Sequence, residues 1–260
     1  MPEALKQLIL QFMGTIYPWI EKEAIFLTGS RAIGTWTPTS DIDILVFINP
    51  KDYSYYLKQS FEHGFRKEGE EAGLEERFSY EGNEVLLEVK FMTELYLSNL
   101  IDYFSYSKMQ LINDNHAKHS SLKADLQKWF DQGYEDRLMQ HYIQAFQDMK
   151  ELKDMFKKEQ KNLMLDTIFI KKGIFLEAVM KLLYLIKRQG YPTVKWMLPL
   201  LDWEEGTWIQ EIVSEVKSLA TLEEFLIMEE KVKRQINKKL MPQRPYVGQR
   251  WKFLSAFKHL

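Results

Sequence analysis

Short apolar runs separated by polar connections mark the first part of the chain. Apolar residues recur at helical spacing between residues 5 and 20, which predicts a helix. Residues 24–28 and 42–48 are apolar runs that predict two buried strands. Gly29 interrupts the pattern between these runs and a polar loop follows it, while residues 53–61 predict a further helix. The pattern therefore predicts a helix, a strand, a glycine turn, a loop, a second strand and a second helix.

A third strand is predicted at residues 84–92, after a Glu-Gly-Asn turn. In this strand Leu86, Glu88 and Lys90 share one face, and the residues between them form an apolar face. Glu88 is thus expected on the face that is not purely apolar. The acidic stretch at residues 68–76 contains two glycines, and we interpret it as a solvated connection.

From about residue 95 the apolar spacing becomes helical and stays so to residue 240. The predicted helical segments include residues 93–105, 122–130, 134–161 and 163–189. No internal repeat or linker separates the two halves, so the change of periodicity alone sets the boundary. We expect two domains, residues 1–110 and residues 111–260, of which the second is helical.

Composition narrows the class of protein. With 260 residues, 45% of them hydrophobic, the chain can bury a sizeable core. Its 35 basic and 37 acidic residues give a formal net charge of −2, so charge provides no case for a nucleic acid or an acidic membrane as an obligatory partner. There are no cysteines, which excludes disulfides and thiolate metal sites. No apolar segment reaches the ~18 residues of a membrane span, and the first residues resemble an amphipathic helix rather than a signal peptide, so we expect a cytoplasmic location.

The candidate chemistry begins with two carboxylates, Asp41 and Asp43, at the start of the second predicted strand. Side chains two apart on a strand point to the same face, so both can converge on one cation. Mg²⁺ prefers oxygen ligands and keeps sites open for substrate phosphates. Two such carboxylates repel each other by roughly a few kcal/mol at an effective dielectric of ~20, a cost that a bound dication reverses.

Gly29 and Ser30 precede these acids and supply complementary donors. Glycine lets the backbone approach a phosphate closely. Ser30 offers a hydroxyl and an amide at the predicted start of a short helix, where N–H groups favour an anion. Donors on one side and metal-binding acids on the other are what phosphoryl or nucleotidyl transfer requires.

The sequence Gly-Ser, ten residues, Asp-Ile-Asp-Ile at residues 29–44 resembles the motif of the DNA polymerase β-like nucleotidyltransferase superfamily. The resemblance covers about the first 100 residues. It implies an α+β fold, with a small mixed sheet followed in this chain by an α-helical bundle. It also implies a third carboxylate from a later strand. Residues 87–91, Leu-Glu-Val-Lys-Phe, resemble that element in antibiotic nucleotidyltransferases of the kanamycin type, which gives the role to Glu88. Glu84 shares a face with Glu88 and is the alternative.

The resemblance implies a two-metal mechanism with Mg²⁺. Asp41 and Asp43 would bridge both ions, and Glu88 would help to hold the ion that activates the acceptor. Ser30 and Arg31 would hold the triphosphate of the nucleotide, for which ATP is the expected donor. Pyrophosphate would be the leaving group.

Two residues of the helical half are candidates by analogy. Glu177 lies in an apolar helix with Lys181 four residues later, which is also the pattern of a helix ion pair. In kanamycin-type enzymes a glutamate of the helical domain is the general base, and the analogy gives this role to Glu177. Lys195 lies in a Tyr-Pro-Thr-Val-Lys-Trp segment that resembles turns in other nucleotidyltransferases. Lys195 could reach a triphosphate, or the segment could be a structural turn.

These expectations combine into an enzyme that transfers a nucleoside monophosphate, expected to be AMP, to a hydroxyl of a small molecule. An aminoglycoside-like antibiotic is one candidate acceptor, because the acids at residues 68–76, or those of the helical half, could bind its amino groups. The alternative is a nucleotidyltransferase of the toxin–antitoxin type, which binds or modifies a protein or RNA. Residues 243–260 are aromatic and basic, and could pack on the cleft or mediate a homodimer.

Overall fold

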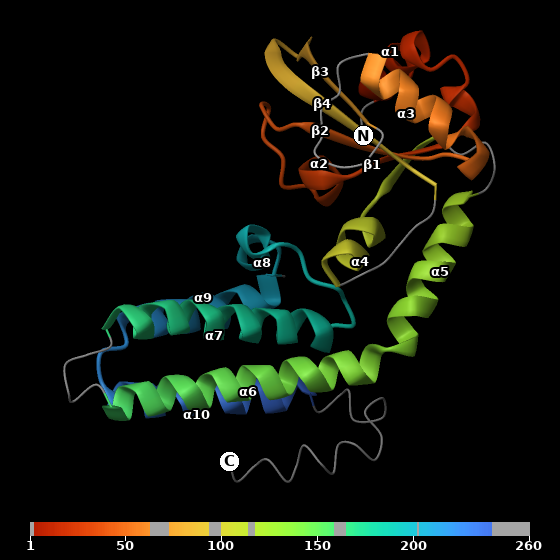
Figure 1. Ribbon diagram of the computed structural model, residues 1–260. Coiled ribbons are helices and arrows are strands. Elements are labelled where there is room, and N and C mark those ends of the chain that lie inside the picture. Colours follow the sequence, from red (N-terminus) through yellow and green to blue (C-terminus); the bar gives the residue numbers. More distant parts are fainter. Residues whose placement is uncertain are drawn as a thin grey trace. The chain divides into compact units, whose positions relative to one another are not determined.

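The computed structural model in Figure 1 describes residues 3–62, 73–93, 100–113, 118–158, 165–201 and 203–240. The chain divides into two compact units, Met1–Phe130 and Asp131–Leu260, which we call the sheet unit and the helical unit. The division predicted from periodicity, between residues 110 and 111, differs from this one by residues 111–130, which include most of the helix α5 (Lys118–Gln132). Whether α5 belongs to the catalytic domain stays a prediction.

The described part of the sheet unit holds five strands in the order β3-β4-β2-β1-β5. They are β1 (Ala24–Leu27), β2 (Ile42–Phe47), β3 (Gly73–Tyr80), β4 (Asn83–Met92) and β5 (Gln110–Asn113). β2 and β4 run parallel, and every other neighbouring pair is antiparallel. This mixed sheet, with helices in both units, confirms the predicted α+β class.

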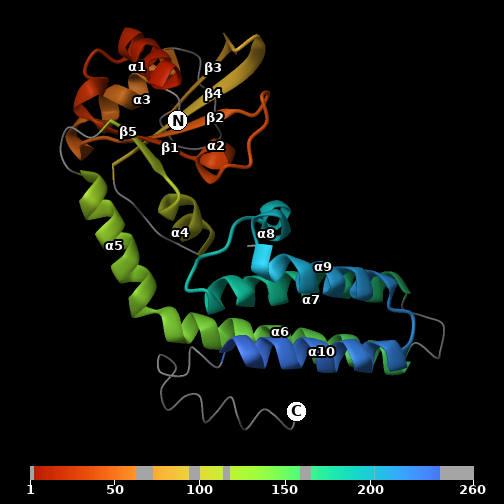
Figure 2. The same cartoon turned by 180° about the vertical axis from the view of Figure 1, so that it is seen from behind.

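Two helices cover one face of the sheet, as Figures 1 and 2 show: α1 (Glu3–Ile16) and α3 (Tyr53–Glu62). Alternate residues of a strand point to one face, and residues four apart share one side of a helix. These two periods bring together the apolar side chains of the main core, all of them buried: Leu5, Ile9, Met13, Ile42, Ile44, Val46, Tyr56, Leu87, Val89 and Phe91.

The opposite face of the sheet is divided into an apolar part and a polar part. The apolar part is a smaller cluster made by Ala24, Phe26, Leu45, Phe47 and Met109. The polar part includes Asp43 and Glu88, which are half-buried. The remaining helical segments of this unit are α2 (Gly29–Ile33), α4 (Leu100–Ser107), α5 and the 3₁₀ turns η1 (Ile20–Lys22) and η2 (Pro50–Asp52).

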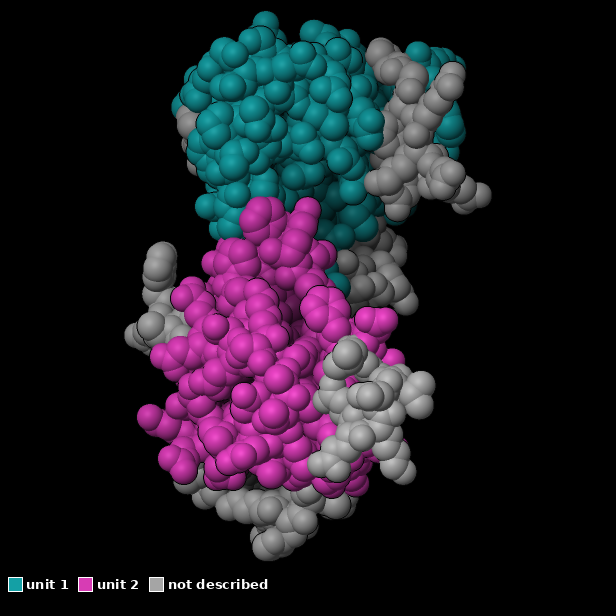
Figure 3. All heavy atoms as spheres, turned by 90° about the vertical axis from the view of Figure 1, so that its left-hand side faces the viewer, with its two compact units in different colours: residues 1–130 teal, residues 131–260 magenta. Residues whose placement is uncertain are grey.

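The helical unit, shown apart from the sheet unit by colour in Figure 3, is built from long helices around an apolar core. Its helices are α6 (Tyr134–Lys158), α7 (Leu165–Ile186), α8 (Val194–Leu200), α9 (Trp203–Ser218) and α10 (Leu222–Leu240). The buried carboxylates Asp148 and Glu229 between these helices form ion pairs with lysines, because a buried charge without a partner is strongly destabilising. Lys171 Nζ lies 2.6 Å from Asp148 Oδ1, and Glu229 contacts the ammonium groups of Lys153 and Lys233 at 2.9 and 2.8 Å.

Most elements predicted from the sequence are confirmed. The three predicted strands and the helix between them correspond to β1, β2, β4 and α3, with ends that differ by one residue. The solvated connection predicted at residues 68–76 is wrong for residues 73–76, which begin β3. The rest of that stretch and the tail at residues 243–260 lie outside the described residues. β5 has no counterpart among the predicted strands.

No helix in the described ranges is both long enough and apolar enough to cross a membrane.

The two faces of β4 should differ in their contribution to stability. Leu87 is 1% exposed in the main core, whereas its neighbour Leu86 is only half-buried on the opposite face. We expect Leu87→Ala to lower the free energy of unfolding by about 2–5 kcal/mol, the range for a buried leucine. Leu86→Ala removes the same atoms and should cost clearly less. Urea denaturation of both variants checks this, and equal losses would contradict the assignment of faces.

Candidate active site

The candidate site starts where β1 ends. The Thr28 amide donates to the Asp43 carbonyl oxygen at 2.8 Å, which joins the end of β1 to β2. Gly29 follows with a φ of +61°, in the left-handed region that glycine adopts without strain. A Cβ atom at Gly29 would overlap the carboxylate of Asp43. The Asp43 side chain therefore lies directly against the Gly29-Ser30 turn, where α2 begins.

The register of the sheet places three acidic residues in one row. Asp43 on β2 pairs with Glu88 on the parallel strand β4, and Glu88 pairs with Glu75 on β3. Neighbouring strands lie about 4.8 Å apart, so the three side chains occupy adjacent positions on one face. This face is the one opposite the main core, as predicted for Glu88.

Glu75 is an acid of this row that the sequence pattern does not indicate. Acids and glycines surround it, which is the pattern of a solvated connection. Apolar or aromatic residues at alternate positions, Leu74, Phe78 and Tyr80, are the signal that could have indicated a strand. Glu75 is exposed, so it adds negative charge at the open edge of the row.

The candidate metal ligands lie at neighbouring backbone positions, but their carboxylate groups do not converge on one point. Asp41 lies one residue before β2 and is exposed, whereas Asp43 is half-buried. Glu88 Oε1 lies 3.2 Å from Lys90 Nζ, two residues along the same face. Within the described ranges, no three acidic or histidine side chains lie close enough to hold a metal ion. The carboxylate oxygens of these three residues fit Mg²⁺ chemically.

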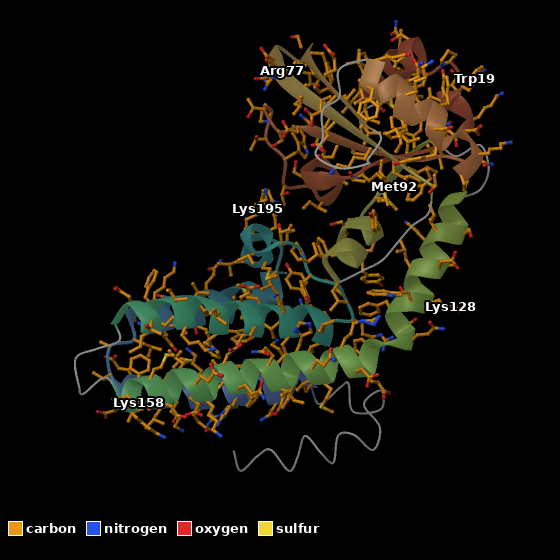
Figure 4. All side chains as sticks on the ribbon, viewed as in Figure 1. Trp19, Arg77, Met92, Lys128, Lys158 and Lys195 are labelled. Atoms are coloured by element: carbon orange, nitrogen blue, oxygen red, sulfur yellow. The ribbon has the colours of Figure 1, made fainter. Side chains whose placement is uncertain are left out.

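Glu84, the alternative third acid, lies apart from this row. It pairs with Ser79 near the β3–β4 turn, and its Oε1 lies 3.1 Å from Nη1 of Arg77, which Figure 4 shows on β3. Four residues of a strand span about 13 Å, so Glu84 is well separated from Glu88. The geometry therefore favours Glu88 over Glu84 as the third acid.

Ser30 and Arg31 occupy the first turn of α2. Ser30 is half-buried, and its carbonyl oxygen accepts a hydrogen bond from the Thr35 amide at 3.0 Å. Arg31 is only 7% exposed, and its guanidinium donates to the carbonyl oxygens of Ser40 and Asp41. That edge of the guanidinium is thus occupied by backbone oxygens, whereas the sequence analysis predicted a contact with the triphosphate.

Glu177 and Lys195 both lie in the helical unit. Glu177 Oε1 is 2.6 Å from Lys181 Nζ, which is the helix ion pair considered as the alternative to a catalytic role. Lys195 is exposed on α8, as Figure 4 shows, with its Nζ 5.6 Å from the centroid of the Trp196 ring. These contacts do not test a role in catalysis or nucleotide binding, so both roles stay predictions.

A polar group next to this ion pair has a shifted pKa. The His141 Nε2 atom lies 3.4 Å from the Tyr191 hydroxyl, and the Lys181 ammonium is 5.3 Å from the Tyr191 ring centroid. Burial, with a smaller contribution from Lys181, lowers the pKa of His141 to about 4. His141 is therefore neutral at physiological pH.

Neither of two cavities found in the described part of the chain is lined by a candidate acid. A cavity of about 300 Å³ in the sheet unit has Arg31, Trp36 and Tyr80 in its wall. A cavity of about 200 Å³ in the helical unit has Tyr142 and Phe146 in its wall. The acids are therefore identified by their chemistry and sheet register, not by a cavity.

Comparison with known proteins places the sheet unit in a family. The chain matches the nucleotidyltransferase domain family over residues 6–112, a range that includes β1, α2, β2 and β4. The chain contains a nucleotidyltransferase domain. This finding supports the predicted resemblance to the polymerase β-like superfamily for this part of the chain. The nucleotidyltransferase domain carries the Gly29-Ser30 turn and all three candidate acids.

Seven chains of solved structures also match. One is a nucleotidyltransferase-like protein from Exiguobacterium sibiricum 255-15, with 11% sequence identity and a TM-score of 0.45. The match covers 91% of the present chain and 76% of that chain. A comparison with curated proteins gave no match.

Replacing Gly29 should disturb the candidate site in addition to destabilising the fold. Gly29→Ala and Gly82→Ala both place a side chain at positive φ, which costs about 1–2 kcal/mol. Only Gly29→Ala also displaces the Asp43 carboxylate, because nothing lies within 4 Å of a Cβ at Gly82. We expect a larger loss of unfolding free energy in Gly29→Ala than in Gly82→Ala, with both variants folded, and loss of Mg²⁺-dependent turnover in Gly29→Ala alone. Equal activity of the two variants would contradict a functional role for the close approach of Asp43 to Gly29.

His141 should make the stability of the protein depend on pH. Its folded pKa of about 4 lies below the ordinary value of 6.5, so the unfolded chain binds more protons between these pH values. The contribution of neutral His141 is complete above about pH 6.5 and is lost as the pH falls towards 4. We expect His141→Gln to flatten the rise of unfolding free energy with pH in this window. Urea titrations across the window measure the slope, and an unchanged slope would contradict the shift.

Proposed function

We propose that the protein transfers a nucleoside monophosphate, most simply AMP from ATP, to a hydroxyl group of a small molecule. The observation that carries the proposal is the contact between the Asp43 carboxylate and the Gly29 backbone, with Glu88 beside Asp43 in the sheet. It joins a turn with hydrogen-bond donors to a row of carboxylates, the two halves that nucleotidyl transfer needs.

In the sheet unit, one set of residues would bind the metal and another set would bind the phosphate groups. Asp41, Asp43 and Glu88 would hold Mg²⁺, for which we propose two ions. When bound, the metal neutralises charge on the triphosphate and lowers the pKa of a coordinated hydroxyl. Gly29 and Ser30 would donate to phosphate oxygens, because the first N–H groups of a helix have no acceptor within it.

The proposed reaction forms one bond and breaks one bond. The acceptor oxygen bonds to the α-phosphorus of the triphosphate, and the bond from that phosphorus to the pyrophosphate oxygen breaks. The hydroxyl proton passes to a base, for which Glu177 is our candidate by analogy. Lys195 is our candidate for a further triphosphate contact. Pyrophosphate leaves with the electron pair.

A small cationic acceptor fits the charges at the site. Glu75 extends the acidic row beyond Glu88 and is exposed, so it could pair with an amino group of the acceptor. An aminoglycoside-like molecule has both the hydroxyl and the amino groups. The net charge of −2 gives no support for a nucleic acid acceptor. We place the reaction in the cytoplasm, where nucleoside triphosphates are made.

Asp43→Asn tests the site assignment. It removes the charge of the central acid while preserving its shape, so we expect Mg²⁺-dependent pyrophosphate release to fall more than about 100-fold, beyond the effect of losing an outer partner of a metal ligand. The assay compares the common nucleoside triphosphates against aminoglycosides, lincosamides and simple sugars. Glu84→Gln is the matched control, because Glu84 is exposed at the far end of β4, and it should keep full activity. Unaltered activity of Asp43→Asn would refute the assignment.

A further inference from the structure

Arg31 is a buried charged residue whose guanidinium donates hydrogen bonds to the loop leading to Asp41. Its side chain is 7% exposed. Nη2 donates to the Ser40 carbonyl oxygen at 2.8 Å, and Nε lies 3.2 Å from the carbonyl oxygens of both Ser40 and Asp41. Because burying an unpaired polar group is costly, these two successive carbonyls stabilise the guanidinium in place. Arg31 therefore ties α2 to the backbone of Asp41 itself.

The loop between α2 and Asp41 is closed by local contacts. Gly34 ends α2 with a φ of +80°. The Thr37 amide donates to Ser40 Oγ at 2.8 Å, and the Ser40 amide donates to the Thr37 carbonyl oxygen at 2.9 Å. The ring centroid of Trp36 lies 4.8 Å from Arg31 Cζ, within the range of a cation–π contact. The loop is thus a compact turn that Arg31 holds at its last residues.

The two acids of the motif are held in different ways. Asp43 lies in β2 and pairs with Glu88 across the sheet, whereas Asp41 precedes the strand and is exposed. The Arg31 contacts fix the backbone of the acid that strand pairing does not fix. We propose that Arg31 is a positioning residue, which holds Asp41 where it can share a metal ion with Asp43, and does not bind the triphosphate. The inference rests on the proposed function, because it takes these two acids as the metal ligands.

Arginine suits this role by its shape. Its planar guanidinium presents N–H groups in a fixed fork that can bond two carbonyl oxygens at once. Lysine carries the same charge as a compact ammonium on a flexible stem. Arg31→Lys therefore keeps the charge that would attract a triphosphate and removes the fork that holds Asp41. The two roles of Arg31 thus give different results in this variant.

The test titrates Mn²⁺ into the full-length protein by calorimetry without nucleotide, and measures pyrophosphate release against Mg²⁺ and against nucleotide concentration. We expect Arg31→Lys to weaken Mn²⁺ binding, and to raise the half-saturating Mg²⁺ concentration, by about tenfold or more, the range for residues that orient metal ligands. The KM for the nucleotide at saturating Mg²⁺ should stay unchanged. Arg77→Lys is the control, because Arg77 pairs with the exposed Glu84 in the same sheet, and it should change nothing.

A second variant keeps the test decisive if Arg31→Lys does not fold. Ser40→Ala removes the hydroxyl that accepts from Thr37, so it loosens the same turn and leaves Arg31 intact. Ser40→Ala should also weaken Mn²⁺ binding, and this result alone then tests whether the turn positions Asp41. Mn²⁺ affinity equal to that of the unaltered protein overturns the inference. A raised KM for the nucleotide with unchanged Mn²⁺ affinity also overturns it and assigns Arg31 to the triphosphate. The calorimetric titration needs no turnover, so failure of the proposed reaction and failure of this inference are distinguishable.

Discussion

The close approach of the Asp43 carboxylate to the Gly29 backbone is the contact on which the site depends. Only a residue without a side chain permits it, because a Cβ at Gly29 would overlap that carboxylate. The positive φ of Gly29 turns the chain from β1 into α2, so the donors of the turn lie beside an acid of the neighbouring strand. A single backbone conformation therefore brings the proposed phosphate-binding turn and the proposed metal ligand Asp43 together.

The sheet supplies the rest of the site by using its two faces differently. One face of β2 and β4 is buried under α1 and α3, and this packing fixes the register of the two strands. A slip by one residue would bury Asp43 and Glu88, which is costly for charged groups. The apolar core thereby holds the acids in adjacent positions on the other face. Arg31 completes this arrangement at Asp41, which strand pairing does not hold.

The sequence was sufficient where local pattern decides structure. Apolar runs and alternation predicted β1, β2 and β4, and the structure confirms these strands. The spacing of glycine, serine and two aspartates indicated Asp41 and Asp43, whose roles stay predictions. β3 was not predicted because acids and glycines obscure the alternation of Leu74, Phe78 and Tyr80, whereas β5 is short and its strand character depends on pairing with the distant strand β1. The contacts of Arg31 were missed for a related reason: its acceptors are carbonyl oxygens nine and ten residues away, and carbonyls carry no sequence signal.

The most direct test of the account is the position of the metal. A crystal of the protein soaked with Mn²⁺ and a non-hydrolysable nucleoside triphosphate would show the ion by its anomalous scattering. The account requires Mn²⁺ between the carboxylates of Asp41 and Asp43, with the triphosphate against the Gly29-Ser30 turn. Mn²⁺ bound elsewhere, or a triphosphate away from this turn, would contradict the assignment of the site.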